Sequence, residues 1–253
     1  MKKIVLLGLT LVALVIFGGS LLSLRRQYNF PNYGAPPYFE EEDGTEQDLG
    51  RFGNLLKWVR PEGPLRVGLQ AGHWKNSELP DELVKLRKTS GGTSNGNTAE
   101  WEVNLAICKE IKKILEKEDI VVDILPATVP TSYWADAFVS IHADGSTSPK
   151  TSGFKVAAPR RDLTGKANGL IALIKQEYAK ITGFDEDPNI TMNMSGYYAF
   201  SWRRFEHAIH PMTPAAILET GFLTNPTEAR MLIKNPQIPA QAIAQALINF
   251  LKP

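Results

Sequence analysis

Short apolar runs alternate with helix-like periodicities along the chain after residue 64. Apolar runs of about four to eight residues are typical of buried strands, and apolar positions three and four residues apart are typical of helices that bury one face. The expected strands are Leu65 to Gln70, Ile120 to Leu125, Ala137 to Ile141, Gly153 to Ala158, Tyr197 to Phe200 and Ala215 to Leu218. The expected helices are Ala99 to Lys117, Thr164 to Ile181 and Pro236 to Phe250. This order predicts a single α/β domain with a twisted, mostly parallel or mixed sheet flanked by helices.

A different pattern occupies the N-terminus, where an uncharged apolar run extends from Ile4 to Leu24. As a helix this run would be roughly 31 Å long, which is close to the thickness of the hydrocarbon core of a bilayer. Lysines precede it, and Arg25 and Arg26 follow it. We therefore expect a single transmembrane helix in the cell membrane, with the body of the protein outside the cytoplasm. The alternative is a signal peptide that is cleaved to release a secreted protein.

The segment between this run and the domain is rich in Pro, Gly, Tyr and acidic residues. It has too little regular apolar pattern to build a core, so we interpret it as an extracytoplasmic linker with a short helix at Asn54 to Val59. The predicted organisation is a membrane anchor at 1–26, a linker at 27–64 and one folded domain at 65–253.

Charge and cysteine content exclude some partners and some sites. The chain has 28 Lys and Arg against 27 Asp and Glu, a balance that gives no indication of nucleic-acid binding. Cys108 is the only cysteine, which excludes intrachain disulfides and any metal site built from several thiolates. A metal would need His and carboxylate ligands. We expect the folded domain to be monomeric.

Three residues with metal-binding or acid–base chemistry follow or end expected strands. His73 stands three residues beyond the first strand, His142 follows Phe138 to Ile141, and Glu219 follows Ala215 to Leu218. In open α/β sheets ligands bind beyond the carboxyl ends of the strands, so these side chains are expected at one edge. Each alone would more often be a hydrogen-bonded structural residue, and only their coincidence indicates a site.

A fourth candidate comes from the helix expected at Ala99 to Lys117. Its apolar stripe includes Val103 and Ile107, and Glu100 lies on the same face, whereas Glu102 falls on the polar face. Glu100 could simply cap the helix at the third position with Asn97 as N-cap. It could instead join the histidines, because two histidines and one carboxylate are a ligand set that leaves an open position on a catalytic zinc ion.

Four segments of the chain together resemble the signature blocks of the zinc-dependent N-acetylmuramoyl-L-alanine amidases, sometimes called type 3. The segments are Val67 to His73, Ala99 to Leu105, Ala135 to Asp144 and Ile217 to Glu228, in the family's order. The resemblance implies that zinc is bound by His73, Glu100 and His142, and that Glu219 is the catalytic glutamate. It also implies a peptidoglycan substrate, with cleavage of the amide between N-acetylmuramic acid and L-alanine.

The sequence departs from the family pattern around the first ligand, where Gln70-Ala-Gly-His-Trp-Lys replaces the usual Asp-Pro-Gly-His-Gly-Gly. The segment from Ser201 to Thr213 is also unusual, and its His207 and His210 are expected to have ordinary packing or surface roles. Two alternatives stay open at this point: a peptidoglycan peptidase with the same zinc site, and a non-catalytic scaffold that binds the wall. A scaffold would have no need of a general base at Glu219.

Overall fold

The structure is a computed structural model that describes residues 55–87 and 92–253. The described residues belong to one compact unit, Leu49–Pro253. The transmembrane helix expected at Ile4 to Leu24 lies outside the described residues and stays a prediction. Within the described part, no helix is long and apolar enough to cross a membrane.

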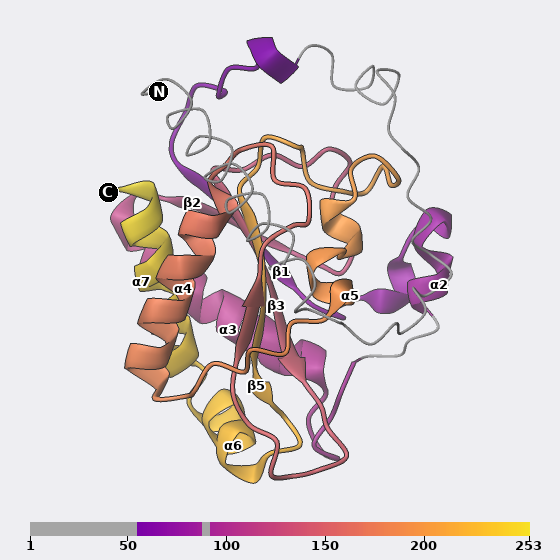
Figure 1. The fold of residues 1–253 in the computed structure, drawn as a ribbon, viewed down its shortest axis with the longest axis vertical. Helices are drawn as coiled ribbons and strands as arrows, with labels where there is room; N and C mark the ends of the chain where they lie inside the picture. Colours follow the sequence, from indigo (N-terminus) through magenta and orange to yellow (C-terminus); the bar gives the residue numbers. More distant parts are fainter. Residues whose placement is uncertain (1–54, 88–91) are drawn as a thin grey trace, which may run out of the picture. The chain divides into compact units, whose positions relative to one another are not determined.

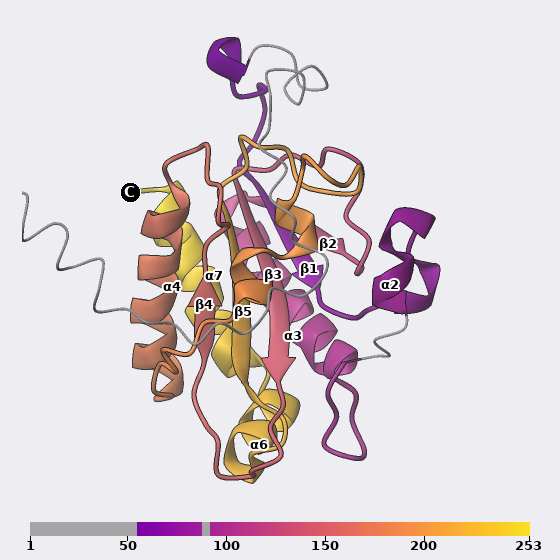
Figure 2. The ribbon, with the colours of Figure 1, turned by 45° about the vertical axis from the view of Figure 1, so that its right-hand side comes forward.

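A five-stranded mixed sheet forms the centre of the domain (Figure 1). Its strands are β1 (Arg66–Ala71), β2 (Val121–Leu125), β3 (Ala137–Asp144), β4 (Lys155–Ala157) and β5 (Ala215–Phe222). They lie in the order β2-β1-β3-β5-β4. All neighbours are parallel except β4, which runs antiparallel to β5 at one edge (Figure 2). The expected α/β domain with a mostly parallel or mixed sheet is therefore confirmed.

The central strands are apolar because both of their faces are covered. Every residue of β3 except Asp144 is buried, and so is every residue of β1 except Arg66. Strands buried on two faces read as continuous apolar runs, which explains why these segments were recognisable in the sequence. Side chains alternate between two clusters, with Val139 and Ile141 on one face and Phe138 on the other.

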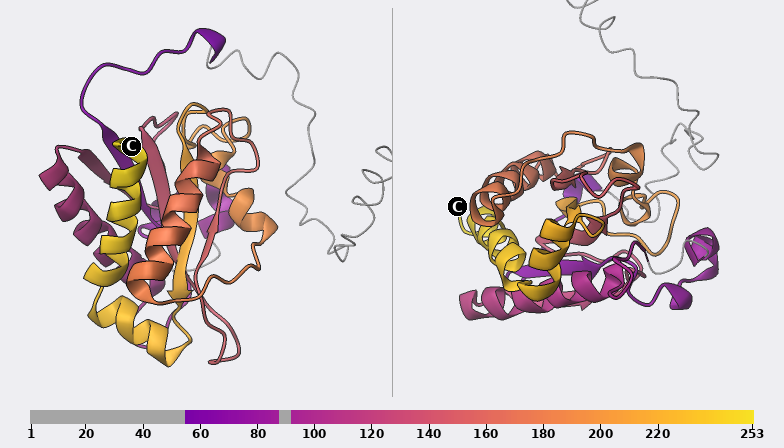
Figure 3. Two further views of the ribbon diagram at one scale, coloured as in Figure 1. Left: turned by 60° about the vertical axis from the view of Figure 1, so that its left-hand side comes forward. Right: turned by 90° about the horizontal axis from the view of Figure 1, so that it is seen from below.

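The remaining described elements are helices and short 3₁₀ turns. The α-helices are α2 (Val84–Arg87), α3 (Glu100–Leu115), α4 (Ala167–Thr182), α5 (Met192–Ser195), α6 (Pro226–Lys234) and α7 (Gln237–Leu251). The 3₁₀ turns are η2 (Leu55–Lys57), η3 (Asn76–Glu78), η4 (Asp81–Leu83), η5 (Glu116–Glu118) and η6 (Tyr198–Phe200). Helices α3, α7 and α4 lie side by side over one face of the sheet, whereas α5 and α2 lie on the other side (Figures 1 and 3).

The strand expected at Tyr197 to Phe200 is wrong, since Tyr198–Phe200 form the 3₁₀ turn η6 and Tyr197 is its N-cap residue. The segment lies over a face of the sheet instead of at an edge, so it has no strand to pair with. The Phe200 ring contacts Phe138 of β3 at a centroid distance of 6.4 Å, and the Tyr198 hydroxyl donates a hydrogen bond to the Ala127 carbonyl. The aromatic residues of this segment therefore pack over the sheet and do not pair as a strand.

The end of the expected linker packs on the domain. Trp58 lies 5.9 Å from Trp134 between ring centroids, and the Arg60 guanidinium donates two hydrogen bonds to the Asp136 carboxylate, at 2.6 and 2.8 Å. A bidentate contact of this kind fixes geometry as well as charge. The first described residues of the chain are thus attached at the start of β3, at the opposite end of that strand from His142.

Candidate active site

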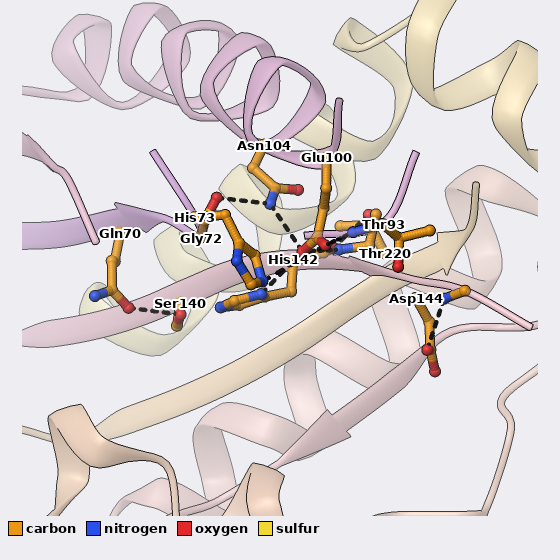
Figure 4. A network of polar contacts seen from close by, with 12 residues as sticks. Gln70, Gly72, His73, Thr93, Glu100, Asn104, Ser140, His142, Asp144 and Thr220 are labelled. Atoms are coloured by element: carbon orange, nitrogen blue, oxygen red, sulfur yellow. Dashed lines mark hydrogen bonds and ion pairs between the residues drawn. The ribbon is translucent and has the colours of Figure 1, made fainter. Parts of the chain in front are cut away.

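His73, Glu100 and His142 converge although they come from three separate elements (Figure 4). His73 follows β1, Glu100 is the first residue of α3, and His142 is near the end of β3. One potential ligand atom from each lies within 4.8 Å of the others. The carboxyl ends of β1 and β3 and the N-terminus of α3 therefore meet at one polar centre.

The turn that carries His73 is tightly constrained. The Gly72 amide donates to the Ile141 carbonyl at 2.9 Å, which ties the turn to β3. A Cβ at Gly72 would lie 2.4 Å from the His142 ring, so only glycine allows the ring to pack there. His73 itself has a positive φ of 63°, which is unfavourable for a residue with a side chain and is maintained only by its surroundings.

Glu100 is buried and surrounded by hydrogen-bond donors. Its Oε2 accepts from the Thr93 amide at 2.8 Å, and its Oε1 accepts from the Ala143 amide at 3.2 Å and lies 3.0 Å from His142 Nδ1. Burial alone would raise the pKa of Glu100, but the hydrogen bond with His142 and the charges of His142 and His73 lower it to about 2. Glu100 is therefore an ionised carboxylate at neutral pH.

The neighbouring Glu102 has the capping role that the sequence left open for Glu100. Its Oε2 accepts a hydrogen bond from the Ala99 amide at 2.8 Å, and its side chain faces solvent. Ala99, and not Asn97, is the N-cap residue of α3. The helix phase expected from the apolar stripe is confirmed, with Glu100 directed inward and Glu102 outward.

His142 is buried beside two carboxylates. Burial lowers the pKa of His142, but its hydrogen bond with Glu100 and the charges of Glu219 and Asp144 outweigh that effect and raise the pKa above its ordinary value. Its outer nitrogen, Nε2, lies 3.4 Å from the Tyr197 hydroxyl. The two sides of the imidazole thus have different neighbours, a carboxylate at Nδ1 and a phenol at Nε2.

Glu219 lies opposite His142 in the register of β3 and β5. Its Oε2 is buried and has no hydrogen-bond partner within the described residues. Burial is the main cause that raises the pKa of Glu219, to about 7. A carboxyl group with this pKa can both accept and release a proton near neutral pH, which is what general acid–base chemistry requires.

His207 and His210 do not join this centre. His207 Nδ1 lies 2.7 Å from Glu82 Oε1, and the same carboxylate accepts the backbone amides of Glu206 and His207. The His210 ring lies 5.7 Å from the Trp58 ring, and its Nδ1 accepts from the Met212 amide at 3.1 Å. Both histidines organise the loop before β5, in agreement with an ordinary packing role.

Three polar residues near the centre were not anticipated as neighbours of the site. Asn104 follows Glu100 by one helical turn, Tyr197 comes from the segment before η6, and Lys155 is the partner of Glu219 in the β4–β5 register. Lys155 Nζ contacts Asp144 and lies 3.3 Å from Asp187 Oδ2. Only Asn104 had a usable signal, its spacing of four residues from Glu100 on a helix.

The donor set fits a divalent metal ion. Two imidazole nitrogens and one ionised carboxylate are ligands that zinc accepts, and three protein ligands leave an open coordination position in a catalytic site. A side chain at Gly92 would place its Cβ only 2.2 Å from Glu100 Oε2, so the Gly92 backbone lies close against this centre. The fold and site together therefore define an α/β protein in which two imidazoles and an ionised carboxylate gather at one edge of the sheet, near the Glu219 carboxyl group with its raised pKa.

Comparison with known proteins identifies the family. The family model for N-acetylmuramoyl-L-alanine amidases matches residues 67–249. The chain is 26% identical over 206 residues to N-acetylmuramoyl-L-alanine amidase AmiA of Escherichia coli K12, an alignment that covers 64% of this chain and 71% of AmiA. It is 25% identical over 247 residues to the probable cell wall amidase LytH of Staphylococcus epidermidis, covering 88% and 79% of the two chains.

Solved structures show the same fold. N-acetylmuramoyl-L-alanine amidase AmiC2 of Nostoc punctiforme superimposes with a TM-score of 0.55 at 20% sequence identity, covering 76% of this chain and all of that one. The apo form of the amidase Ami1 from Mycobacterium abscessus gives a TM-score of 0.54 at 20% identity, covering 74% and 99%. Because the family model spans most of the chain, this protein belongs to the N-acetylmuramoyl-L-alanine amidase family.

Proposed function

We propose that this chain is a zinc-dependent amidase that hydrolyses the bond between the lactyl group of N-acetylmuramic acid and L-alanine in peptidoglycan. Family membership supports the reaction and the substrate class. The observation that carries the proposal is the convergence of donor atoms from His73, Glu100 and His142 within 4.8 Å, together with Glu219, whose buried Oε2 lies on the strand next to His142.

His73, Glu100 and His142 are the residues proposed to hold the metal. When bound there, zinc would supply Lewis-acid polarisation of the scissile carbonyl and would make water more acidic. The protein prepares the centre by keeping Glu100 ionised and by burying His142 of β3 with its Nδ1 against Glu100 of α3. Buried hydrogen bonds from the Thr93 and Ala143 amides hold the Glu100 carboxylate in place.

Glu219 is proposed as the general base and then the general acid. It would accept the proton of the attacking water and deliver it to the nitrogen of L-alanine as the amide bond breaks. Two observations support this role: Oε2 has no competing hydrogen bond in the described part of the chain, and burial raises the pKa of the group to about 7. A carboxyl group that only stabilised the fold would be expected to have its oxygens satisfied.

Product analysis separates this proposal from its two alternatives. Purified peptidoglycan is incubated with the full-length protein, and the soluble and insoluble products are identified by mass spectrometry. The proposal predicts intact stem peptides with a free L-alanine amino group, together with glycan that has lost its peptides. Shortened peptides would indicate a peptidoglycan peptidase, and unchanged peptidoglycan with retained binding would indicate a scaffold.

A further inference from the structure

Asn104 lies on the inward face of α3, one turn after Glu100 (Figure 4). Its side chain is fully buried. Residues four apart on a helix are neighbours on the same face, so the Asn104 amide lies directly above the Glu100 carboxylate. The other buried positions on this face include Val103, Ile107 and Ile111, and Asn104 is a polar exception among them.

The amide nitrogen of Asn104 contacts two parts of the metal centre. Nδ2 donates to Glu100 Oε1 at 3.3 Å and to the Gly72 carbonyl at 3.2 Å. Gly72 immediately precedes His73, and the Gly72 amide is already bonded to β3. One side-chain group therefore connects the helix that carries Glu100 to the turn that carries His73.

The other end of the Asn104 amide is unsatisfied. Oδ1 is buried and has no hydrogen-bond partner among residues 55–87 and 92–253. A buried acceptor without a partner destabilises the folded state, whereas an apolar side chain of similar shape would avoid that cost. Leucine at position 104 would remove this unsatisfied oxygen, but it would also leave the Gly72 carbonyl and Glu100 Oε1 without the Nδ2 donor. The contribution of Asn104 therefore lies in the two bonds donated by Nδ2.

Those two bonds act where the backbone is under strain. His73 has a left-handed φ of 63°, a conformation that persists in a residue with a side chain only when its surroundings enforce it. Gly72, the residue before His73, is held at its amide by the Ile141 carbonyl and at its carbonyl by Asn104 Nδ2. Loss of the Asn104 bond would allow this turn to relax and would change the separation of the His73 and Glu100 donors.

We propose that Asn104 is a positioning residue that couples the His73 turn to the Glu100 carboxylate and thereby sets the affinity of the centre for its metal. The inference rests on the proposed function, because it assumes that His73 and Glu100 bind a metal ion. Residues that orient metal ligands through hydrogen bonds typically contribute a factor of about 10 to 100 in affinity. Asn104 would act on Glu100 directly and on His73 through the Gly72 carbonyl.

The test is the zinc affinity of the full-length Asn104→Leu variant, measured by competition with a chelator of known affinity. We expect zinc binding to weaken by about 10- to 100-fold. The thermal midpoint of the metal-free variant should be close to that of the metal-free wild type, because leucine removes the unsatisfied Oδ1 and also the two bonds donated by Nδ2. With Co²⁺ as the probe, the variant should show altered ligand-field absorption bands, since a purely structural role would not change the metal geometry.

Two further variants keep the test decisive. Asn104→Ala removes the same donor without requiring space for leucine, and its zinc affinity should fall by a similar factor even if its thermal midpoint is lower. Thr182→Val is the matched control, since it removes a buried hydroxyl that donates to the Tyr178 carbonyl at 2.6 Å on α4. Thr182→Val should leave zinc affinity unchanged.

Unchanged zinc affinity in either folded Asn104 variant would overturn the proposed coupling role of Asn104. The proposed metal site of His73, Glu100 and His142 would not be affected by that result. A lower thermal midpoint of Asn104→Leu with wild-type zinc affinity would assign Asn104 a structural role only. If the wild-type chain bound neither zinc nor cobalt, the proposed function would fail first, and this inference would fail with it.

Discussion

His142 and Glu219 lie directly opposite each other on the parallel strands β3 and β5, although 77 positions separate them in the chain. The pairing places a proposed metal ligand and the proposed acid–base carboxyl group side by side near the carboxyl ends of the two strands. Strand register therefore determines the geometry of the site, and a shift of one residue would direct Glu219 to the other face.

Glu219→Gln should retain metal and fold but lose about 10² to 10⁴ in turnover. Glutamine is nearly isosteric, so packing in β5 should survive, but it has no basic oxygen to accept a proton. Turnover is measured on peptidoglycan, and zinc content by elemental analysis. His207→Ala is the control and should stay active, because His207 is paired with Glu82 away from the centre. Loss of zinc from the glutamine variant would instead make Glu219 a ligand.

Glu100→Ala and Glu102→Ala should have different consequences although the residues are two apart. Glu100→Ala removes a buried carboxylate from the centre, so both bound zinc and activity should be lost. Glu102→Ala removes only a hydrogen bond to the Ala99 amide, so it should cost about 1 kcal/mol of stability or less and leave zinc unchanged. Zinc analysis and thermal unfolding distinguish the two, and equal loss of zinc would contradict the observed helix phase.

The stability of the metal-free chain should depend on pH through Glu219. Burial raises the pKa of this carboxyl group from 4.5 to about 7, so between these values the folded chain holds a proton that the unfolded chain has released. Rising pH therefore favours unfolding over this window. The stabilisation that the protonated Glu219 gives the folded chain is lost above about pH 7. The glutamine variant does not titrate there. The difference between the thermal midpoints of the Glu219→Gln variant and of wild type should therefore shift in favour of the variant between pH 4.5 and 8. A difference that stays constant over this range would refute the raised pKa of Glu219.

The N-terminal run Ile4 to Leu24 is predicted to hold the protein in the membrane with the folded domain outside the cytoplasm. Full-length protein should sediment with membranes and resist extraction by high salt, and externally added protease should reach the domain. Deletion of residues 1–26 is the control and should release the protein to the soluble fraction. A mature N-terminus that begins after Leu24 would support the alternative, a cleaved signal peptide and a secreted enzyme.

The sheet could be predicted from the sequence because its central strands are buried on both faces. Phe138 to Ile141 and Ala215 to Leu218 read as unbroken apolar runs, and the polar residues at their ends identified one edge of the sheet. The inward direction of Glu100 followed from helical periodicity in the same way. These features depend on local patterns of burial, and the sequence carries such patterns directly.

Other features depend on contacts between distant segments and left weaker signals. A strand was expected at the aromatic-rich segment Tyr197 to Phe200, but Tyr198–Phe200 form η6 and pack over the sheet. Helix α6 was not anticipated; it has only nine residues, too few for a long periodic pattern. Its start was nevertheless marked by Asn225, whose side chain accepts the Thr227 and Glu228 amides, and by Pro226 at the first position. The contact of Tyr197 with His142 had no sequence signal.

The central claim is that activity requires a metal held by His73, Glu100 and His142. The most direct measurement is the zinc content of the full-length wild-type protein, determined together with peptide release from peptidoglycan before and after treatment with a chelator. The account predicts one zinc per chain, loss of peptide release when zinc is removed, and recovery when zinc is restored. A metal-free protein that releases stem peptides at the same rate in the presence of chelator would contradict it.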